Sequence, residues 1–252
     1  MDRSQLYIST VSAGCDRAAA RHGLGLEIAE YCTASNLDAP IPQVLAAAES
    51  HRQAASRFVF HAPFNELCPA AIDPLAVDLT RRRYRQALAA ARDWGCRVMI
   101  VHTGFIPLVY FPEWFVEKSI TFWQAFLREV PEDMTLCLEN VMEPSPRIPV
   151  DIVRQVADPR LRLCLDVGHA NTEVSRTPVM EWVEQCRPYL RHLHLHNNAG
   201  GWDLHDPLDR GTVPMEEVLR TLAGERHLSY TLETLQAEEN VLWLQDKGFL
   251  EI

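Results

Sequence analysis

The sequence lacks the features that define membrane-spanning, secreted and cysteine-ligated metal proteins. No apolar run approaches the roughly 20 residues that a membrane span needs, and MDRSQLYIST reaches a strand-like segment without the apolar core of a signal peptide. The seven cysteines are odd in number, widely spaced and free of any C-x-x-C pair, which disfavours a disulfide framework or a thiolate metal site. We therefore expect a cytoplasmic protein with reduced cysteines.

The chain also has few basic residues. Its 24 Lys and Arg face 34 Asp and Glu, so the formal charge is −10. Such a balance disfavours a broad nucleic-acid surface, because phosphate contacts come from clustered Lys and Arg. No G-x-G-x-x-G follows the first strand-like segment, which argues against a dinucleotide site. Nothing resembles a linker, so we expect one domain over residues 1–252.

What the sequence does contain is a regular alternation of strands and helices. Short segments rich in Val, Ile and Leu alternate with amphipathic segments along the whole chain. The predicted strands are 6–10, 25–30, 58–61, 98–102, 136–140, 163–167, 192–196 and 230–233. The clearest predicted helices are 78–94, 112–130, 179–186, 215–223 and 237–247. Eight such repeats in 252 residues predict an α/β fold, a single closed (β/α)8 TIM barrel.

Histidines and acidic residues gather at the ends of the predicted strands and in the loops that follow them. At strand ends stand His61, His102, Glu139, Asp166 and Glu233, segment 192–196 carries His192, His194 and His196, and the loops carry His169, Asp203 and His205. Because parallel strands of a barrel end at one mouth, we expect these side chains to converge there. A single strand-end histidine is usually structural, but the joint pattern indicates a divalent metal site. His192 and His227 remain structural in this interpretation, and His196 is either a support for a ligand or a substrate contact.

Several motifs together make the chain resemble a known superfamily. HAPFNE, VHTG, LENV, LDVGHAN, HLHLHNN, GWDLHDPLDRGT and LET, between residues 58 and 234, resemble the xylose-isomerase-like barrels. That superfamily includes sugar phosphate isomerases, sugar epimerases and endonuclease-IV-like abasic-site endonucleases. The resemblance implies that a central divalent ion, Mn, Zn, Fe or Co, is held by Glu139, Asp166, His194 and Glu233.

The endonuclease branch of this superfamily implies two further ions. Their ligands would be His61 and His102 with Glu139 for one ion, and His169, Asp203 and His205 for the other. The chain departs from that branch at Asp209-Arg210-Gly211, where the family often has G-x-G, and at His196-Asn197, where H-x-N-D would place Asn and Asp. The resemblance thus allows one to three ions per chain.

Two chemistries are compatible with this constellation. In a sugar or sugar-phosphate isomerase or epimerase, the ion would lower the cost of an enediolate, and Glu139 and Glu233 would act as acid and base. His169, His196, Arg210 and Trp202 would contact the substrate, and the aromatic loop TGFIPLVYFPEWF would close over it. In a phosphodiesterase, two or three ions would activate water and stabilise the leaving oxygen.

We favour the isomerase or epimerase, because the strand-end loops hold few Lys or Arg for tracking a phosphate backbone. Three divalent ions would bring the formal charge from −10 to −4, so nucleic acid is disfavoured rather than excluded. A non-catalytic sugar-binding barrel ranks third, because binding alone needs fewer buried ligands. Small-molecule sugars are thus the expected partners, and the sequence leaves open whether the barrel forms a homo-oligomer.

Overall fold

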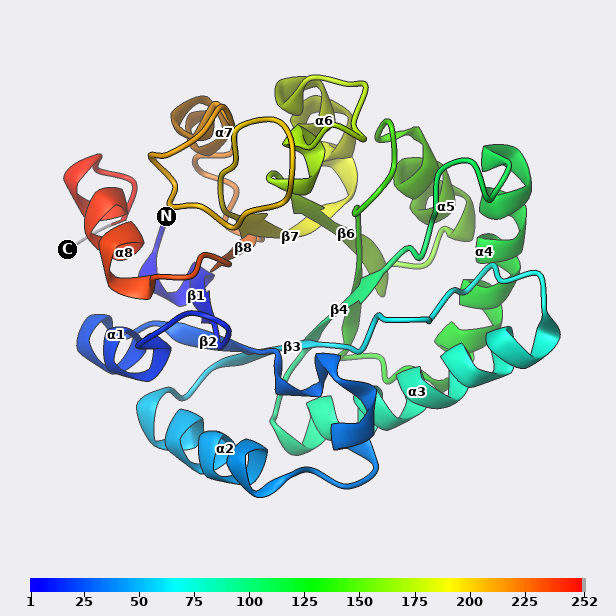
Figure 1. Cartoon of the computed structure of the whole chain (residues 1–252), viewed down its shortest axis with the longest axis horizontal. Coiled ribbons are helices and arrows are strands. Elements are labelled where there is room, and N and C mark those ends of the chain that lie inside the picture. The colour runs from blue at the N-terminus through cyan, green and yellow to red at the C-terminus, as the bar shows by residue number, and fades with distance from the viewer. Residues whose placement is uncertain (251–252) are drawn as a thin grey trace.

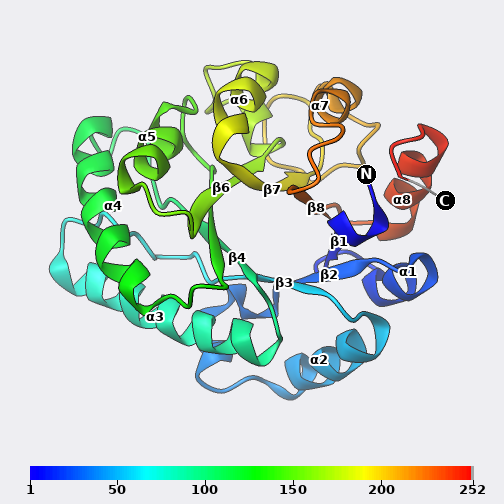
Figure 2. The same ribbon diagram turned by 180° about the vertical axis from the view of Figure 1, so that it is seen from behind.

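The structure, a computed structural model, describes residues 1–250 and confirms the predicted barrel. Its strands are β1 (Leu6–Ser9), β2 (Gly25–Ile28), β3 (Phe58–His61), β4 (Val98–His102), β5 (Thr135–Glu139), β6 (Leu161–Asp166), β7 (Leu190–Leu195) and β8 (Ser229–Leu232). Its α-helices are α1 (Cys15–His22), α2 (Pro42–Ala54), α3 (Pro74–Asp93), α4 (Pro112–Phe126), α5 (Arg147–Val156), α6 (Val179–Cys186), α7 (Met215–Thr221) and α8 (Ala237–Asp246). The strands are parallel and in sequence order, and β8 pairs with β1 to close the barrel inside a ring of helices (Figure 1). Figure 2 shows the same ring from the opposite end.

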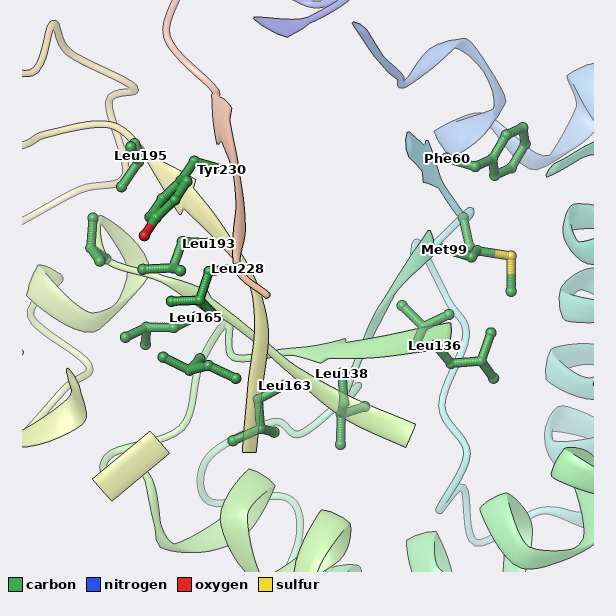
Figure 3. Packing of buried hydrophobic residues seen from close by; sticks show 14 of the residues in the cluster. Phe60, Met99, Leu136, Leu138, Leu163, Leu165, Leu193, Leu195, Leu228 and Tyr230 are labelled. Carbon is green, nitrogen blue, oxygen red and sulfur yellow. The ribbon is translucent and has the colours of Figure 1, made fainter. Parts of the chain in front are cut away.

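Two apolar layers flank the strands because successive side chains alternate between their faces. Inside the barrel, Val59, Ile100, Cys137 and Cys164 form one buried cluster. On the outside, leucines such as Leu136 pack between the strands and the helices (Figure 3). Cys137 and Cys164 therefore lie one layer below Glu139 and Asp166, which follow them by two residues in the same strands.

Most strand ends were predicted one residue too long at the mouth. Asn140 and Glu233, for example, follow β5 and β8 instead of ending them. Asn140 lies outside the strand because its side chain, instead of its main chain, pairs with β6. Its Nδ2 donates to the Asp166 carbonyl at 3.0 Å, and its Oδ1 accepts from the Asp166 N–H at 2.9 Å. The chain thus turns into its loop where a side chain replaces main-chain pairing.

Helix limits also differ from the prediction in places. α3 begins at Pro74 instead of residue 78, because the Asp73 carboxylate accepts the Leu75 N–H at 2.8 Å and Pro74 occupies the first helical position. α4 ends at Phe126 and continues as a short 3-10 turn, Leu127–Glu129. Among residues 1–250, no helix combines the length and apolar character that crossing a membrane requires.

A buried histidine clamps the first two helices to the loop after β2. His51 of α2 is 5% exposed, and its Nδ1 lies 2.5 Å from Asp16 Oδ1 while its Nε2 lies 2.8 Å from Glu30 Oε1. Contact with a carboxylate at both nitrogens favours the doubly protonated ring. Burial opposes that charge, but the two carboxylates outweigh it and raise the pKa of His51 above its ordinary value.

Replacing His51 with glutamine is expected to destabilise the fold by about 2 kcal/mol in mildly acidic solution and by less in alkaline solution. Because the pKa of His51 is raised in the folded protein, His51 stabilises the fold fully below pH 6.5, its ordinary pKa. This stabilisation is lost as pH rises through the pKa of His51 in the folded protein. Burial would raise the pKa of Glu30, but His51 lowers it, so that contribution disappears as pH falls below 4.5. The effect is therefore largest between pH 4.5 and 6.5.

Denaturant unfolding of wild type and His51→Gln at pH 6 and pH 9 measures this difference. The matched control is His227→Gln, because the His227 side chain is 53% exposed and its only ion pair in residues 1–250 is with Glu225 at 3.5 Å. The control should stay within about 0.5 kcal/mol of wild type at both pH values. An effect of His51→Gln that is equal at pH 6 and pH 9 would contradict the charged clamp.

Candidate metal centre

Parallel strands bring the predicted ligands to one end of the barrel. His102 and Glu139 are direct partners in the β4–β5 register, as are Asp166 and His194 in the β6–β7 register. The long loop between β7 and α7 lies over this end of the barrel in Figure 1. The nine residues His61, His102, Glu139, Asp166, His169, His194, Asp203, His205 and Glu233 form one connected network of close contacts.

Three carboxylates converge on one nitrogen of His194. Its Nδ1 lies 2.9 Å from Glu233 Oε2, 3.3 Å from Glu139 Oε1 and 3.6 Å from Asp166 Oδ2. These are the four residues that the resemblance assigns to the central ion. The imidazole is fully buried, as are the carboxylates of Glu139 and Asp166, whereas the Glu233 side chain is 14% exposed.

Glu27, inside β2, is a site residue that the sequence prediction missed. Its Oε1 lies 3.0 Å from His194 Nε2, and its Oε2 lies 3.2 Å from His192 Nε2 and accepts the Thr231 hydroxyl at 2.6 Å. Burial would raise the pKa of this carboxyl, but His194 and His192 lower it well below its ordinary value. The signal was its position between Leu26 and Ile28, because alternation points an acid there into the barrel, where it needs a partner.

This contact bears on which nitrogen of His194 faces the three carboxylates. Glu27 Oε1 and His194 Nε2 lie 3.0 Å apart without a well-formed hydrogen bond, so Glu27 acts through its charge: it favours a proton on Nε2, and the neutral ring then presents the lone pair of Nδ1 toward Glu139 and Glu233. A carboxylate behind a histidine is the usual support for a metal-binding imidazole, because it orients the ring and raises its basicity. Glu27 and Nδ1 of His194 are therefore arranged for a cation among the three carboxylates.

A second group shares Glu139. His61 Nε2 and His102 Nε2 each lie 3.3 Å from Glu139 Oε2, while Oε1 of the same carboxylate faces His194. His61 Nδ1 donates to the Ala62 carbonyl at 2.9 Å, which leaves Nε2 of the neutral ring as an acceptor. The two oxygens of Glu139 thus point to two different sets of nitrogens, the geometry of a bridging ligand.

A third group lies toward the β7–α7 loop. Asp203 Oδ2 is 3.2 Å from His169 Nε2 and 3.0 Å from His205 Nε2. Both rings donate from Nδ1 to backbone carbonyls, His169 to Asn140 at 2.8 Å and His205 to Glu233 at 2.6 Å. Their Nε2 atoms therefore face the same carboxylate oxygen in a matched orientation.

Charge in the centre is balanced between carboxylates and imidazoles. Burial would raise the pKa of Glu139, but His102 and His194 outweigh it and hold the pKa of this carboxyl well below its ordinary value. Burial would lower the pKa of His169, but Asp166 and Asp203 raise it well above its ordinary value. Protons on the histidines thus take the place of positive charge that this acidic cluster requires.

The donor set fits a divalent cation. Glu139 Oε2, Glu233 Oε2 and His196 Nδ1 are buried and make no hydrogen bond within residues 1–250. Groups of three possible ligands recur through the centre, among them His61 with Glu139 and His194, and His196 with His205 and Glu233. Mixed nitrogen and oxygen ligands suit Zn, Mn, Fe or Co. Buried acceptors without donors are what a cation would satisfy.

The predicted substrate contacts divide into two sets. His169 lies in the centre, and His196 Nε2 contacts Asp166 Oδ1 at 2.9 Å, which gives His196 a supporting position. Trp202 is 79% exposed, and the Arg210 side chain, 66% exposed, pairs with Glu239 at 3.4 Å. The structure therefore does not bring Trp202 and Arg210 into the network, and their contact with substrate stays a prediction.

Comparison with known proteins identifies the family of the chain. A family model described as xylose isomerase-like TIM barrel matches residues 17–250. The chain belongs to this family. A curated relative, the uncharacterized protein MJ1311 of Methanocaldococcus jannaschii, is 28% identical over 174 residues, 65% of this chain. The match spans 59% of the length of that relative.

Solved structures share the whole barrel of this xylose isomerase-like chain. A D-tagatose 3-epimerase-like protein superposes with a TM-score of 0.76 and 22% identity, covering 97% of this chain and 96% of that one. The TTHB071 protein of Thermus thermophilus, in a crystal soaked with ZnCl2, gives a TM-score of 0.73 and 24% identity, with 97% of each chain covered. At these identities the likeness establishes the fold, and the chemistry must be argued from the site.

Proposed function

We propose that this protein is a divalent-metal-dependent isomerase or epimerase of a sugar or sugar phosphate, working by proton transfer at a carbon next to a carbonyl. The observation that carries the proposal is the convergence of Glu139, Asp166 and Glu233 on His194 Nδ1. A D-tagatose 3-epimerase-like protein shares this fold, so the barrel is a scaffold compatible with such chemistry. Glu139, Asp166, His194 and Glu233 would hold the central ion, and the other five residues of the network would hold any further ions.

Glu139 and Glu233 would move the proton. They come from β5 and from the residue after β8, non-adjacent strands, and each lies close to His194. Two carboxylates that approach one bound sugar from different strands allow one to remove a proton from carbon and the other to return it. Glu139 is held ionised by His102 and His194, so it has the charge state that a proton acceptor needs. Glu27 and Asn140 would keep His194 and Asp166 in place.

A bound divalent cation would supply Lewis-acid stabilisation of the negative charge that develops on the substrate oxygens. His194 would bind it through Nδ1, because Nε2 faces Glu27. The burial of Glu139 and Asp166 excludes water from these carboxylates and strengthens their interaction with charge.

Deuterium incorporation tests this function directly. The metal-loaded protein is incubated in deuterated water with panels of ketoses and ketose phosphates, and the carbon next to the carbonyl is followed by NMR. Deuterium at that carbon is expected for at least one sugar. An abasic-site oligonucleotide is incubated in parallel, and its cleavage without any deuterium incorporation would reject the isomerase in favour of the hydrolase.

One observation favours the second candidate, a multinuclear phosphodiesterase. Glu139 faces two sets of nitrogens, and Asp203 with His169 and His205 completes a third group, so these residues would suffice to hold three ions. Such clusters bind phosphodiesters between ions. Against it, Arg210 of the mouth loop is paired with Glu239 at 3.4 Å, which offsets the positive charge that this loop could offer a phosphate.

Replacing His205 with alanine separates the two candidates. In a one-metal epimerase we expect less than about a threefold loss of kcat/KM, because His205 contacts Asp203 and the main-chain carbonyl of Glu233, but neither His194 nor the Glu233 carboxylate. A hydrolase that needs the third ion should lose at least about 100-fold. Steady-state rates and metal content per chain, measured on the same preparations, decide between them.

A further inference from the structure

An apolar cavity of about 380 Å³ adjoins the metal centre. It lies between the loops that follow β3 and β4 and reaches the first residues after β5. Fourteen residues line it, among them Phe64, Glu66, His102, Ile106 and Met142. Its volume is at the lower end of the range of about 300–1,000 Å³ that is usual for small-molecule sites.

His102 joins the cavity to the metal centre. Its Nε2 faces Glu139 at 3.3 Å, while its ring stacks on Phe64 with centroids 4.2 Å apart and planes 12° apart. Phe64 also meets the ring of His61 edge-on, at 5.6 Å. The cavity therefore lies next to any molecule bound at the metal centre. Phe64 and His102 form the aromatic wall between the two.

The walls of the cavity favour an apolar group over a phosphate. None of the fourteen lining residues is Lys or Arg, and Glu66 adds negative charge that repels an anion. Ile106 and Met142 line it with side chains that are 45% and 44% exposed, so a bound apolar group would cover them. The two loops approach closely at Gly104, where φ is +76° and a Cβ would lie 2.9 Å from the Leu67 carbonyl.

We propose that this cavity binds an apolar substituent of the substrate, so that the substrate is a carbonyl sugar carrying a ring-sized apolar group and not a terminal phosphate. The inference rests on the proposed function for the position of the sugar. The sugar carbons would lie at the metal centre, and the substituent would pass Phe64 into the cavity. Binding energy from the substituent would hold the reacting carbon between Glu139 and Glu233.

The test compares D-fructose with 6-O-benzyl-D-fructose on the metal-loaded protein. Saturation-transfer NMR measures binding, and deuterium incorporation measures reaction. We expect the benzyl ether to bind about tenfold more tightly than D-fructose, with the strongest saturation on its ring protons. Equal affinity for the two sugars, or no saturation of the ring, would overturn the inference.

Matched variants locate the binding. Ile106→Lys places a charge at the cavity and should abolish the tenfold preference, whereas Ile72→Lys should retain it, because Ile72 is 72% exposed and outside the cavity lining. Met142→Lys, from a different loop, should repeat the loss even if Ile106→Lys does not fold. Equal preference in Ile106→Lys, Met142→Lys and Ile72→Lys would refute the assignment.

Binding and deuterium incorporation test the apolar cavity and the isomerase function separately. Benzyl-dependent binding that Ile106→Lys removes, without deuterium incorporation in any sugar, would support the cavity and reject the isomerase. Deuterium incorporation with equal affinities for both sugars would support the isomerase and reject the cavity as a substrate site.

Discussion

Replacing Glu139 with glutamine is expected to lower kcat by at least about 1,000-fold and to reduce the metal bound per chain. Glutamine keeps the size of the side chain but removes the charge that His61, His102, His169 and His194 all contact. In the proposed site, the variant would lose the base and one metal ligand at once. Deuterium incorporation and elemental analysis on one preparation measure both effects.

Glu143→Gln is the matched control for this prediction. Glu143 is a buried acid in the loop directly after β5, but it contacts the Thr103 hydroxyl and the Val141 N–H instead of the metal centre. Burial raises the pKa of Glu143, so an uncharged amide resembles its protonated form. The control should keep activity within about threefold of wild type and bind the full amount of metal. Wild-type metal content and turnover in Glu139→Gln would contradict the central assignment.

The sequence predicted the barrel well because its signals are local. Each strand is a short apolar run, and each helix is an amphipathic segment of several turns, as in Val179–Cys186, where the predicted and observed limits agree. Ends that depend on tertiary contacts were less accurate. β5 stops before Asn140 because that side chain bonds to Asp166 on the next strand, a contact that no local pattern contains.

The metal-centre geometry was predictable in part for a similar reason. Residues at strand ends, such as His102 and Glu139, meet because parallel pairing brings strand ends together, so their positions in the sequence were sufficient. Glu27 was missed because it lies inside a strand and acts through His194. The exposed positions of Trp202 and Arg210 depend on the course of the β7–α7 loop, which composition does not determine.

Chelation is expected to lower the midpoint of thermal unfolding by on the order of 10 °C. A cation present at about 1,000 times its dissociation constant stabilises a fold by about 4 kcal/mol, and each kcal/mol shifts a domain of this size by about 2–4 °C. Calorimetry before and after chelation, with elemental analysis, measures the shift. Asp166→Asn should reduce it, because Asp166 contacts His194, whereas Glu143→Gln should keep it.

The same experiment at two pH values distinguishes binding at this centre from adventitious metal. Burial would lower the pKa of His194, but the carboxylates of Glu27, Glu233 and Glu139 raise it well above its ordinary value, so the metal-free ring carries protons on both nitrogens. A cation bound at Nδ1 must displace the proton on that nitrogen, so the affinity for the cation rises with pH. The shift in midpoint should be larger at pH 8 than at pH 6, with proton release visible by titration calorimetry in two buffers. A metal-free protein whose midpoint equals that of the loaded protein at both pH values would leave the three carboxylates stabilised by histidine protons alone, and the centre would then be structural.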